Sequence, residues 1–367
     1  MRACALALIA LVAVGGFAPA ADAKKKKKKK GKNAAALTVL TRNIYLGGDI
    51  TRPIAATTPE EFAQKTGELW EVIQQTDFPS RAPLLAKEIK RTKPHVIGLQ
   101  EAALWRRGPD GQADGYATPA TTVVYDFVKL LRRALKKAGV PYRVAVSQNE
   151  IDLEAPTSFG YDVRLTMRDV ILVRKGLKRF KVRRTSGDNF DARLTLPTQV
   201  GPVDVIRGWT ALDATWKGKK FRVVNTHLEA FLPDARLAQA EELVARGGPA
   251  RKKGTVFIIG DLNSDPRGDP PDEDADPVPY NAITDFGFFD TWILKNKRKP
   301  GFSCCMNQEN IMDPPPAPFD HRIDHILVNR KLKVIRTRIV GNDRKNRSSG
   351  GLWPSDHGGL ASTVRLK

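Results

Sequence analysis

The feature that most constrains the fold of this chain is the alternation of short apolar runs with amphipathic segments from Leu37 onward. Buried strands are apolar along their whole length, whereas surface helices repeat apolar residues every three or four positions. The expected strands are Leu37–Asn43, Val96–Gln100, Tyr142–Ser147, Met167–Arg174, Val203–Thr215, Lys220–Thr226, Val256–Gly260, His321–Val328 and Gly359–Leu366. The expected helices are Thr58–Gln75, Ala82–Arg91, Thr121–Lys137 and Asp234–Ala245. This pattern predicts an α/β fold with mixed sheets.

The N-terminal segment predicts export. Arg2 precedes an uncharged apolar run, Ala3–Phe17, that is followed by small residues in two Ala-x-Ala patterns. Because the run is short for a membrane span, we expect a cleaved signal peptide over residues 1–23 rather than a retained anchor. The protein is then secreted or associated with the cell envelope. With no repeat of fixed period in the sequence, residues 37–367 are expected to form a single catalytic domain.

A lysine-rich arm over residues 24–36 separates the signal peptide from this domain. Like charges repel, so Lys24 to Lys32 predicts a disordered segment. Its role stays open between a tether to an anionic surface or nucleic acid and a solvated linker. The chain carries a formal charge of +21. Nine basic residues against Asp22 in residues 1–32 leave +13 for the body, which should therefore attract polyanions.

The cysteines do not predict a disulfide scaffold. Cys4 would be lost with the signal peptide, which leaves the adjacent pair Cys304 and Cys305. This pair predicts either a vicinal disulfide or two free, half-buried thiols. Without His or Cys at metal spacing, it makes a poor zinc site.

Unusual polar residues gather where the expected strands end. They are Asn43, Glu101, Arg168 with Asp169, His227, Asp261 with Asn263, Arg322 with Asp324, and Asp356 with His357. In layered α/β proteins, strand ends and the loops after them converge on a site. The set suits phosphoester hydrolysis at a hard metal ion, which needs a cation, a group that activates water and donors for developing charge.

The chemistry of each group predicts a role. Asn43, Glu101 and Asp356 fit an oxygen-ligated Mg²⁺ site, with Mn²⁺ as the alternative ion. Asp261 can orient or deprotonate the attacking water, and the Asn263 amide can donate to a phosphoryl oxygen. His227 and His357 can donate to the phosphate or relay protons, while Asp324 can fix the tautomer of His357.

The motifs occur in a characteristic order: Thr-Arg-Asn-Ile at 41–44, Gly-Leu-Gln-Glu at 98–101, Asn-Thr-His-Leu at 225–228, Gly-Asp-Leu-Asn at 260–263, Arg-Ile-Asp-His-Ile-Leu at 322–327 and Ser-Asp-His at 355–357. This series resembles the endonuclease/exonuclease/phosphatase superfamily over roughly Leu37 to Leu366. The resemblance implies a deoxyribonuclease I-like, four-layer α/β/β/α sandwich with two packed mixed sheets. It also implies Glu101 and Asn43 at the metal, Asp261 and Asn263 at the nucleophile and phosphate, His227 as a phosphate donor, and Asp324 paired with His357 beside Asp356.

Other residues are expected less directly. Arg236 and Gln239 form an Arg-x-x-Gln feature of the superfamily, which braces the fold or lies on a solvated helix face. Arg168 lies where relatives place a phosphate-contacting residue, although Arg168-Asp169 departs from their Gly-Asn; we place Arg168 with Asn43 and Asn263 as substrate-binding residues. Asp49 is a candidate for lining the site. His95, His321 and His325 are left outside the catalytic set, since strand alternation directs the latter two away from Asp324.

Two substrate classes follow from these features. A secreted nuclease agrees with the basic body, because cationic surface drives phosphate-backbone binding. A sphingomyelinase-type phospholipid phosphodiesterase, or a phosphatase on a small phosphate ester, is the alternative. A membrane-inserting aromatic hairpin would favour lipid, and Phe286–Trp292 is the nearest candidate, although its pattern also fits a buried strand. We expect a monomer.

Overall fold

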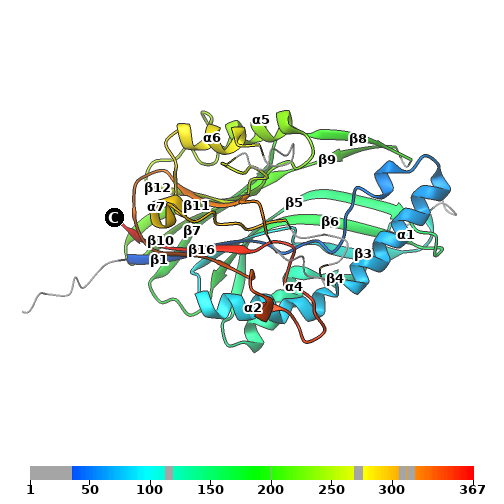
Figure 1. Cartoon of the computed structure of the whole chain (residues 1–367), viewed down its shortest axis with the longest axis horizontal. Coiled ribbons are helices and arrows are strands. Elements are labelled where there is room, and N and C mark those ends of the chain that lie inside the picture. The colour runs from blue at the N-terminus through cyan, green and yellow to red at the C-terminus, as the bar shows by residue number, and fades with distance from the viewer. Residues whose placement is uncertain (1–34, 112–118, 200, 268–275, 306–310, 312–318) are drawn as a thin grey trace, which may run out of the picture. The chain divides into compact units, whose positions relative to one another are not determined.

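The computed structural model describes residues 35–111, 119–199, 201–267, 276–305, 311 and 319–367 (Figure 1). The signal peptide and nearly all of the lysine-rich arm lie outside these residues. The first strand, β1 (Ala35–Asn43), begins two residues before the expected start of the domain. Among the described residues, no helix is both long enough and apolar enough to cross a membrane.

Eight strands form the first sheet, in which β1 and β2 are parallel neighbours. The order is β15 (Lys333–Val340), β16 (Gly359–Leu366), β1, β2 (Val96–Gln100), β6 (Asp162–Arg174), β3 (Leu104–Gly108) and β4 (Thr122–Asp126), with β5 (Tyr142–Pro156) paired to β6. The other pairs are antiparallel, so the sheet is mixed.

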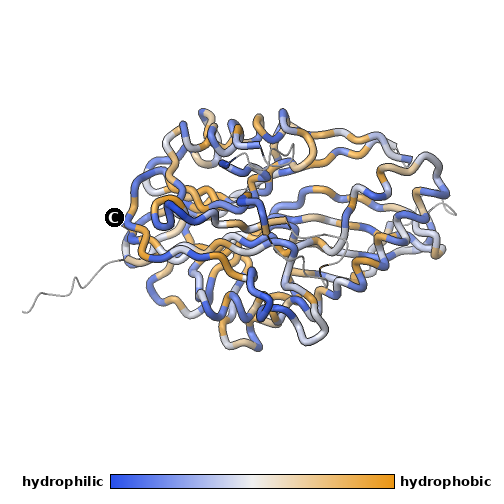
Figure 2. The backbone as a smooth tube through the Cα atoms, in the orientation of Figure 1, coloured by the Kyte–Doolittle hydropathy of each residue, from blue (hydrophilic) through white to orange (hydrophobic). Residues whose placement is uncertain are grey.

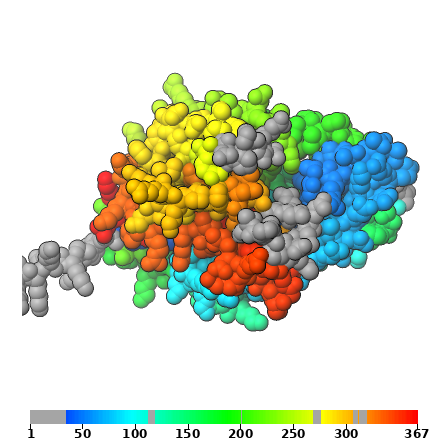
Figure 3. Space-filling view, in the orientation of Figure 1, coloured from blue at the N-terminus to red at the C-terminus, as the bar shows by residue number. Residues whose placement is uncertain are grey.

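The second sheet has six strands and is also mixed, because β11 and β12 run parallel. Its order is β13 (Phe289–Asp290), β14 (Asp324–Val328), β12 (Thr255–Asp261), β11 (Lys219–His227), β10 (Gly208–Trp216) and β7 (Phe180–Asn189). A separate hairpin consists of β8 (Leu194–Thr198) and β9 (Gly201–Val205). The end of the chain, orange to red in Figure 3, covers the middle and lower part of the face shown there.

The helices cover the outer faces of the two sheets (Figure 1). Apolar residues of α1 (Pro59–Gln75), α2 (Phe78–Thr92) and α4 (Phe127–Lys137) share a core with the first sheet. Those of α5 (Pro233–Val244) and α6 (Val278–Asp285) share a core with the second. The remaining helical elements are short: η1 (Pro53–Ala55), α7 (Ile293–Asn296) and η3 (Arg344–Asn346).

A third core lies between the sheets, where Val39 and Ile171 of the first sheet pack with Val223 and Phe257 of the second. Figure 2 shows the resulting pattern, with hydrophobic stretches along the strands and hydrophilic residues on helices and loops. The order of layers is therefore helix, sheet, sheet, helix, and the predicted α/β/β/α sandwich is confirmed.

The element boundaries show where sequence patterns were insufficient. The expected strand Val203–Thr215 is two strands, β9 and β10, because the chain passes from the separate hairpin into the second sheet at Arg207. The expected helix Thr121–Lys137 begins as strand β4. The strands β3, β7, β8 and β15 were not predicted. In β7 and β15 exposed, largely basic side chains interrupt the apolar runs that identify buried strands.

The two parallel pairs end side by side and position the site. In the first sheet Asn43 is paired with Gln100, and in the second His227 is paired with Asp261. The sheets meet closely here, since Gln100 Nε2 donates to Asn225 Oδ1 over 2.6 Å. Gly98 permits this approach, because a Cβ at that position would lie 2.0 Å from the same Asn225 oxygen. The carboxyl ends of four strands from two sheets therefore converge on one end of the sandwich.

Candidate active site

A cavity of about 350 Å³ opens at this end of the sandwich. The predicted residues Glu101, His227, Asp261, Asn263 and His357 all line it. Asp49 does so as well, as its position after β1 had indicated. Residues from both sheets thus face one space.

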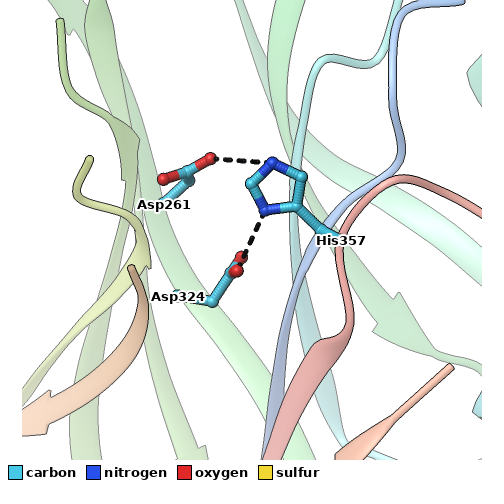
Figure 4. Close-up of side chains that lie close together, drawn as sticks. All are labelled: Asp261, Asp324 and His357. Atoms are coloured by element: carbon cyan, nitrogen blue, oxygen red, sulfur yellow. Dashed lines mark hydrogen bonds and ion pairs between the residues drawn. The ribbon is translucent and has the colours of Figure 1, made fainter. Parts of the chain in front are cut away.

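Two carboxylates hold the imidazole of His357 between them (Figure 4). Asp324 Oδ2 lies 3.0 Å from His357 Nδ1, and Asp261 Oδ2 lies 3.7 Å from His357 Nε2. All three residues are buried. Ligand atoms of the three lie within 4.8 Å of one another. The Asp324–His357 pair expected from the sequence is present, and Asp261 faces the opposite nitrogen.

Asn43, at the end of β1, joins the catalytic groups of the two sheets. Its amide nitrogen donates to Glu101 Oε1 over 2.7 Å and to Asp261 Oδ2 over 3.0 Å. Its carbonyl oxygen accepts the Tyr45 amide over 2.9 Å. The side chain therefore turns its nitrogen, rather than its oxygen, toward the carboxylates.

Glu101 and Asp356 enter the site on the loops that follow β2 and precede β16. The second oxygen of Glu101, Oε2, accepts the Leu46 amide over 2.7 Å. Asp356 is buried, and its Oδ1 accepts from the Ser355 hydroxyl over 3.2 Å. Burial raises the pKa of Asp356, His357 opposes this shift, and the Glu101 carboxylate adds to it.

Two buried arginines fix the loops that carry these residues. Arg81 of α2 donates to the carbonyls of Ile44 and Tyr45 after β1, and to the carbonyl of Pro354 before Asp356. Arg42 donates to the backbone carbonyl of His357. Because a guanidinium has five donors in a rigid plane, each arginine can hold two chain segments at a fixed separation.

A buried arginine also sets the tautomer of His227. Arg207 Nη1 lies 3.1 Å from His227 Nδ1, and Arg207 Nε donates to Glu229 over 3.3 Å. Because a guanidinium only donates, Nδ1 must accept and Nε2 must carry the proton of the neutral ring. That Nε2 lies 3.6 Å from Asp261 Oδ2. Burial, together with Arg207 and His357, lowers the pKa of His227 well below its usual value, which keeps the ring neutral.

The charges at the centre of the site are strongly perturbed. Burial lowers the pKa of His357, but Asp324, Asp261 and Asp356 outweigh it and raise this pKa to about 10. Burial, partly offset by His357, raises the pKa of Asp261 to about 6 and that of Asp356 to about 7. Near neutral pH His357 is therefore a cation. It is the positive charge that the carboxylates of Asp324, Asp261 and Asp356 have in common.

A second pair of buried carboxylates, Glu150 and Asp169, lies near Arg207, the arginine that contacts His227. Burial raises the pKa of Glu150 to about 8 and that of Asp169 well above its usual value, although Arg207 opposes both shifts. Neither oxygen of Asp169 has a hydrogen-bond partner in the described part of the chain. Arg207 is the cation that all the neighbouring carboxylates share.

Asn263 and the loop after His227 complete the wall of the cavity. The Asn263 amide nitrogen donates to the Leu228 carbonyl over 2.9 Å, and the Asn263 backbone donates to Asp261 Oδ1 over 3.1 Å. Arg236 and Gln239 are buried and bond to the backbone of Glu229. Both residues therefore brace this loop, and the solvated helix face that was the alternative is excluded.

Arg168 is directed elsewhere. Its guanidinium donates to the carbonyls of Ala102 and Ala103 and to Asp126, and its neighbour Met167 lines the cavity instead. These contacts support the loop after Glu101 and give no support to the expected role in substrate binding.

The pair Cys304–Cys305 is a disulfide that lines the cavity, with Cys304 Sγ 3.6 Å from His357 Nε2.

Other lining residues were missed from the sequence. His321, which strand alternation was expected to direct away, lines the cavity because β14 begins only at Asp324 and alternation does not extend to position 321. His95 is structural, since its Nδ1 accepts the Thr38 amide. Arg207, Tyr45 and Phe231 also line the cavity. Among Arg207, Tyr45 and Phe231, only Arg207 stands out in the sequence, as an isolated arginine between two apolar runs.

The donor set fits a hard divalent cation. Glu101, Asp261 and Asp356 offer carboxylate oxygens, and the buried Asp324 Oδ1 has no partner among the described residues. A cation would offset the burial of charge, and the smaller repulsion between carboxylates, that raise the pKa values of Asp261 and Asp356. Glu101 and Asp356 remain the residues we expect to hold it, whereas Asn43, whose side-chain nitrogen donates to Glu101, would position that carboxylate and not serve as a ligand.

Comparisons with known proteins agree with this geometry. The model of the Endonuclease/Exonuclease/phosphatase family matches residues 67–357. No curated protein shows a significant sequence match to the chain. Solved structures resemble the fold, among them a family protein from Leptotrichia buccalis with 17% identity and a TM-score of 0.55, covering 90% of this chain and 100% of that one.

Two further structures have named activities or ligands. A Bacteroides thetaiotaomicron mannosyl-6-phosphatase shares 17% identity, and D. rerio TDP2 complexed with a single-strand DNA product shares 15%. Each has a TM-score of 0.52, with 90% of this chain and 100% of that chain covered. The family match, the fold and the site agree: this chain belongs to the endonuclease/exonuclease/phosphatase family of metal-dependent phosphoester hydrolases.

Proposed function

We propose that this protein is an exported, monomeric Mg²⁺-dependent phosphodiesterase that hydrolyses nucleic acid. The observation that carries the proposal is the set of contacts from Asp324 through His357 to Asp261, and from Asn43 to Glu101. These contacts support the assignment of His357 as an imidazolium, Asp261 as a carboxylate base and Glu101 as an oxygen ligand beside one cavity. These are the three components that metal-assisted phosphoester hydrolysis requires.

Glu101 and Asp356 would hold the Mg²⁺ ion, and Asn43 would orient the Glu101 carboxylate through its hydrogen bond. When bound, the ion neutralises charge on the phosphoryl oxygens and positions the substrate. Mn²⁺ prefers similar oxygen ligands and is expected to substitute.

The remaining groups of the site act on water and phosphate. Asp261, with its pKa of about 6, is suited to accept a proton from the attacking water near neutral pH. His227 directs its Nε2 hydrogen into the cavity, and Asn263 has a second amide hydrogen that can donate to a phosphoryl oxygen. The charged His357, held by Asp324, stabilises the negative charge that develops in the transition state.

Nucleic acid is supported as substrate by the net charge of +13 on residues 33–367 and by the single-strand DNA product in the structure of D. rerio TDP2, which has a similar fold. A small phosphate ester is the second candidate, because the cavity has an apolar wall formed by Phe231, Ile323 and the Cys304–Cys305 disulfide. Such a wall suits the body of a compact ligand. A phospholipid headgroup remains the third class.

A substrate panel tests the proposal. The purified chain is incubated with Mg²⁺ and, separately, with plasmid DNA, single-stranded DNA, RNA, a sugar phosphate, a soluble inositol phosphate and sphingomyelin vesicles. We expect cleavage of nucleic acid that is lost in His357→Ala. Exclusive turnover of a sugar or inositol phosphate would replace the nuclease proposal while leaving the site intact, and absence of any turnover would overturn both.

A further inference from the structure

The end of the sandwich opposite the cavity carries an extreme concentration of positive charge. Six segments form it: 93–95, 174–181, 216–220, 251–254, 329–333 and 365–367. Together they hold fifteen exposed lysines and arginines and no aspartate or glutamate. We call these segments the basic end.

Strand pairing places the six segments together. Leu366 pairs with Ala35, Arg365 with Lys333, and Trp216 with both Lys219 and Phe180. Direct hydrogen bonds join neighbouring segments, from Arg330 to the Gly254 carbonyl and from Arg174 to the Lys93 carbonyl. The Trp216 indole donates to the Ala36 carbonyl over 2.8 Å and links the two sheets at this end.

The basic end and the cavity lie at opposite ends of the same strands. β1 runs from Ala35 at the basic end to Asn43 in the site, and β11 runs from Lys219 to His227. Each of these strands has nine residues, so eight steps of about 3.3 Å separate its two ends by about 26 Å. The positive charge of the basic end is therefore too far from the cavity to contact a phosphate that is being cleaved there.

Exposed aromatic side chains border the basic end. Phe286 is 41% exposed, and the Arg251 guanidinium lies 4.3 Å from its ring centroid. Phe289 is 38% exposed and pairs in β13 with Val328, which directly precedes the segment 329–333. Aromatic residues beside lysines and arginines are typical of protein surfaces at the membrane interface. The Phe286–Trp292 stretch is thus not a fully buried strand.

We propose that the basic end, with Phe286 and Phe289 at its edge, docks on an anionic phospholipid bilayer. The charge extends over the ends of two packed sheets, which suits a planar anionic surface. A single-stranded polynucleotide is typically bound along a groove with aromatic stacking platforms, and none of the exposed large hydrophobic residues of the described chain lies within the six segments. Each basic residue near an anionic membrane contributes about 1 kcal/mol.

Docking in this orientation turns the cavity away from the membrane. The enzyme would then act on a soluble phosphoester while held at the bilayer, and a substrate embedded in the same bilayer would not reach the site. The chain enters the described structure at Ala35, at the basic end, so the lysines that end at Lys32 are joined to the protein there.

Vesicle binding tests the proposal. The full chain with Lys219, Lys220, Lys252 and Lys253 replaced by Gln is compared with a matched variant that loses four exposed basic residues elsewhere (Lys87, Lys129, Arg133 and Lys345, also to Gln). Both are made in the natural chain and in a chain whose arm lysines are replaced by Gln. Co-sedimentation uses vesicles of equimolar phosphatidylglycerol and phosphatidylcholine, with pure phosphatidylcholine as the uncharged control.

We expect the basic-end variant to bind the anionic vesicles at least about tenfold more weakly than the matched variant in both backgrounds. Replacing Phe286 and Phe289 by Ser should weaken binding further without affecting binding to a DNA oligonucleotide. Equal vesicle binding by the two lysine variants would overturn the proposal. If the basic-end variant instead loses oligonucleotide binding and keeps vesicle binding, this end is a nucleic-acid surface.

Discussion

The two ends of the central strands carry opposite chemistry. At the cavity end, strand termini deliver Asn43, His227 and Asp261 into a buried cluster joined by specific short contacts. At the basic end, fifteen exposed cations have no acidic residue in their own segments. One end is organised by hydrogen-bond geometry, and the other by net charge.

The difference shows which properties of the chain can serve catalysis. Buried groups at the cavity end have pKa values shifted by their neighbours, as proton transfer near neutral pH requires. Exposed cations at the basic end are screened by salt and act through their number. Part of the overall charge that first indicated a polyanion substrate therefore belongs to the proposed docking surface, and the site must be judged from its geometry.

The largest effect should come from the catalytic cluster. His357→Ala and Asp261→Asn should each lower turnover by at least about a hundredfold, because a positioned proton-transfer group contributes about 10²–10⁴. Asp285→Asn, at an exposed carboxylate on α6, is the control and should keep full activity. Circular dichroism should show all three folded, and all three should bind anionic vesicles equally. Near-normal turnover of folded His357→Ala would remove this residue from the mechanism.

Arg207 should matter for stability as well as for activity. Its replacement by Gln leaves Glu150, Asp169 and Glu229 without their shared cation, and breaking a buried ion pair typically costs about 3–5 kcal/mol. The control is Arg222→Gln, whose partner Asp213 is partly exposed, for which we expect about 1 kcal/mol or less. Urea denaturation measures both. Equal losses of unfolding free energy in the two variants would mean that Arg207 does not stabilise Glu150, Asp169 and Glu229 as a shared cation.

Stability should depend on pH through Glu150. Its pKa is raised from 4.5 to about 8, so between these values the folded state binds more protons than the unfolded state. Stability is therefore greatest below about pH 4.5 for this group and falls as the pH rises toward 8, by at most about 1.4 kcal/mol per pH unit. Glu150→Gln should flatten this dependence in thermal melts between pH 5 and 8. An unchanged slope would show that Glu150 is ionised in the fold.

The sequence predicted the fold well where burial imposes a pattern. Val96–Gln100 and Gly359–Leu366 were predicted to the residue, because both are largely buried strands of the first sheet. The exposed strand β7 was missed, since its alternating basic residues resemble a solvated loop. Strand-end polarity likewise identified the five predicted residues that line the cavity, because parallel strands deliver their termini to one place.

What the sequence did not predict depends on directions and contacts between distant segments. Arg168 was expected to bind substrate, but its side chain turns toward Ala102, Ala103 and Asp126. The link from Arg207 to His227 joins residues twenty positions apart, one between β9 and β10 and the other at the end of β11. The disulfide Cys304–Cys305 was one of two alternatives, and its position beside His357 follows only from the fold.

The smallest expected effect is that of the basic end on turnover at the cavity. Replacing Lys219, Lys220, Lys252 and Lys253 by Gln should change turnover of a small soluble phosphodiester by less than about twofold, because these residues lie about 26 Å from the cavity and are screened at physiological salt. Steady-state kinetics on bis-p-nitrophenyl phosphate measures this. A tenfold loss would mean that the basic end contributes directly to catalysis.

One measurement tests the separation of the two ends most directly. A single sample of the natural chain is assayed for phosphodiester hydrolysis and for binding to anionic vesicles, first with Mg²⁺, then in excess chelator, and then after Mg²⁺ is restored. We predict that chelation abolishes hydrolysis, that Mg²⁺ recovers it, and that vesicle binding stays constant throughout. Full hydrolysis in excess chelator would contradict metal-dependent catalysis at the cavity end, and vesicle binding that follows the metal would contradict a separate basic end.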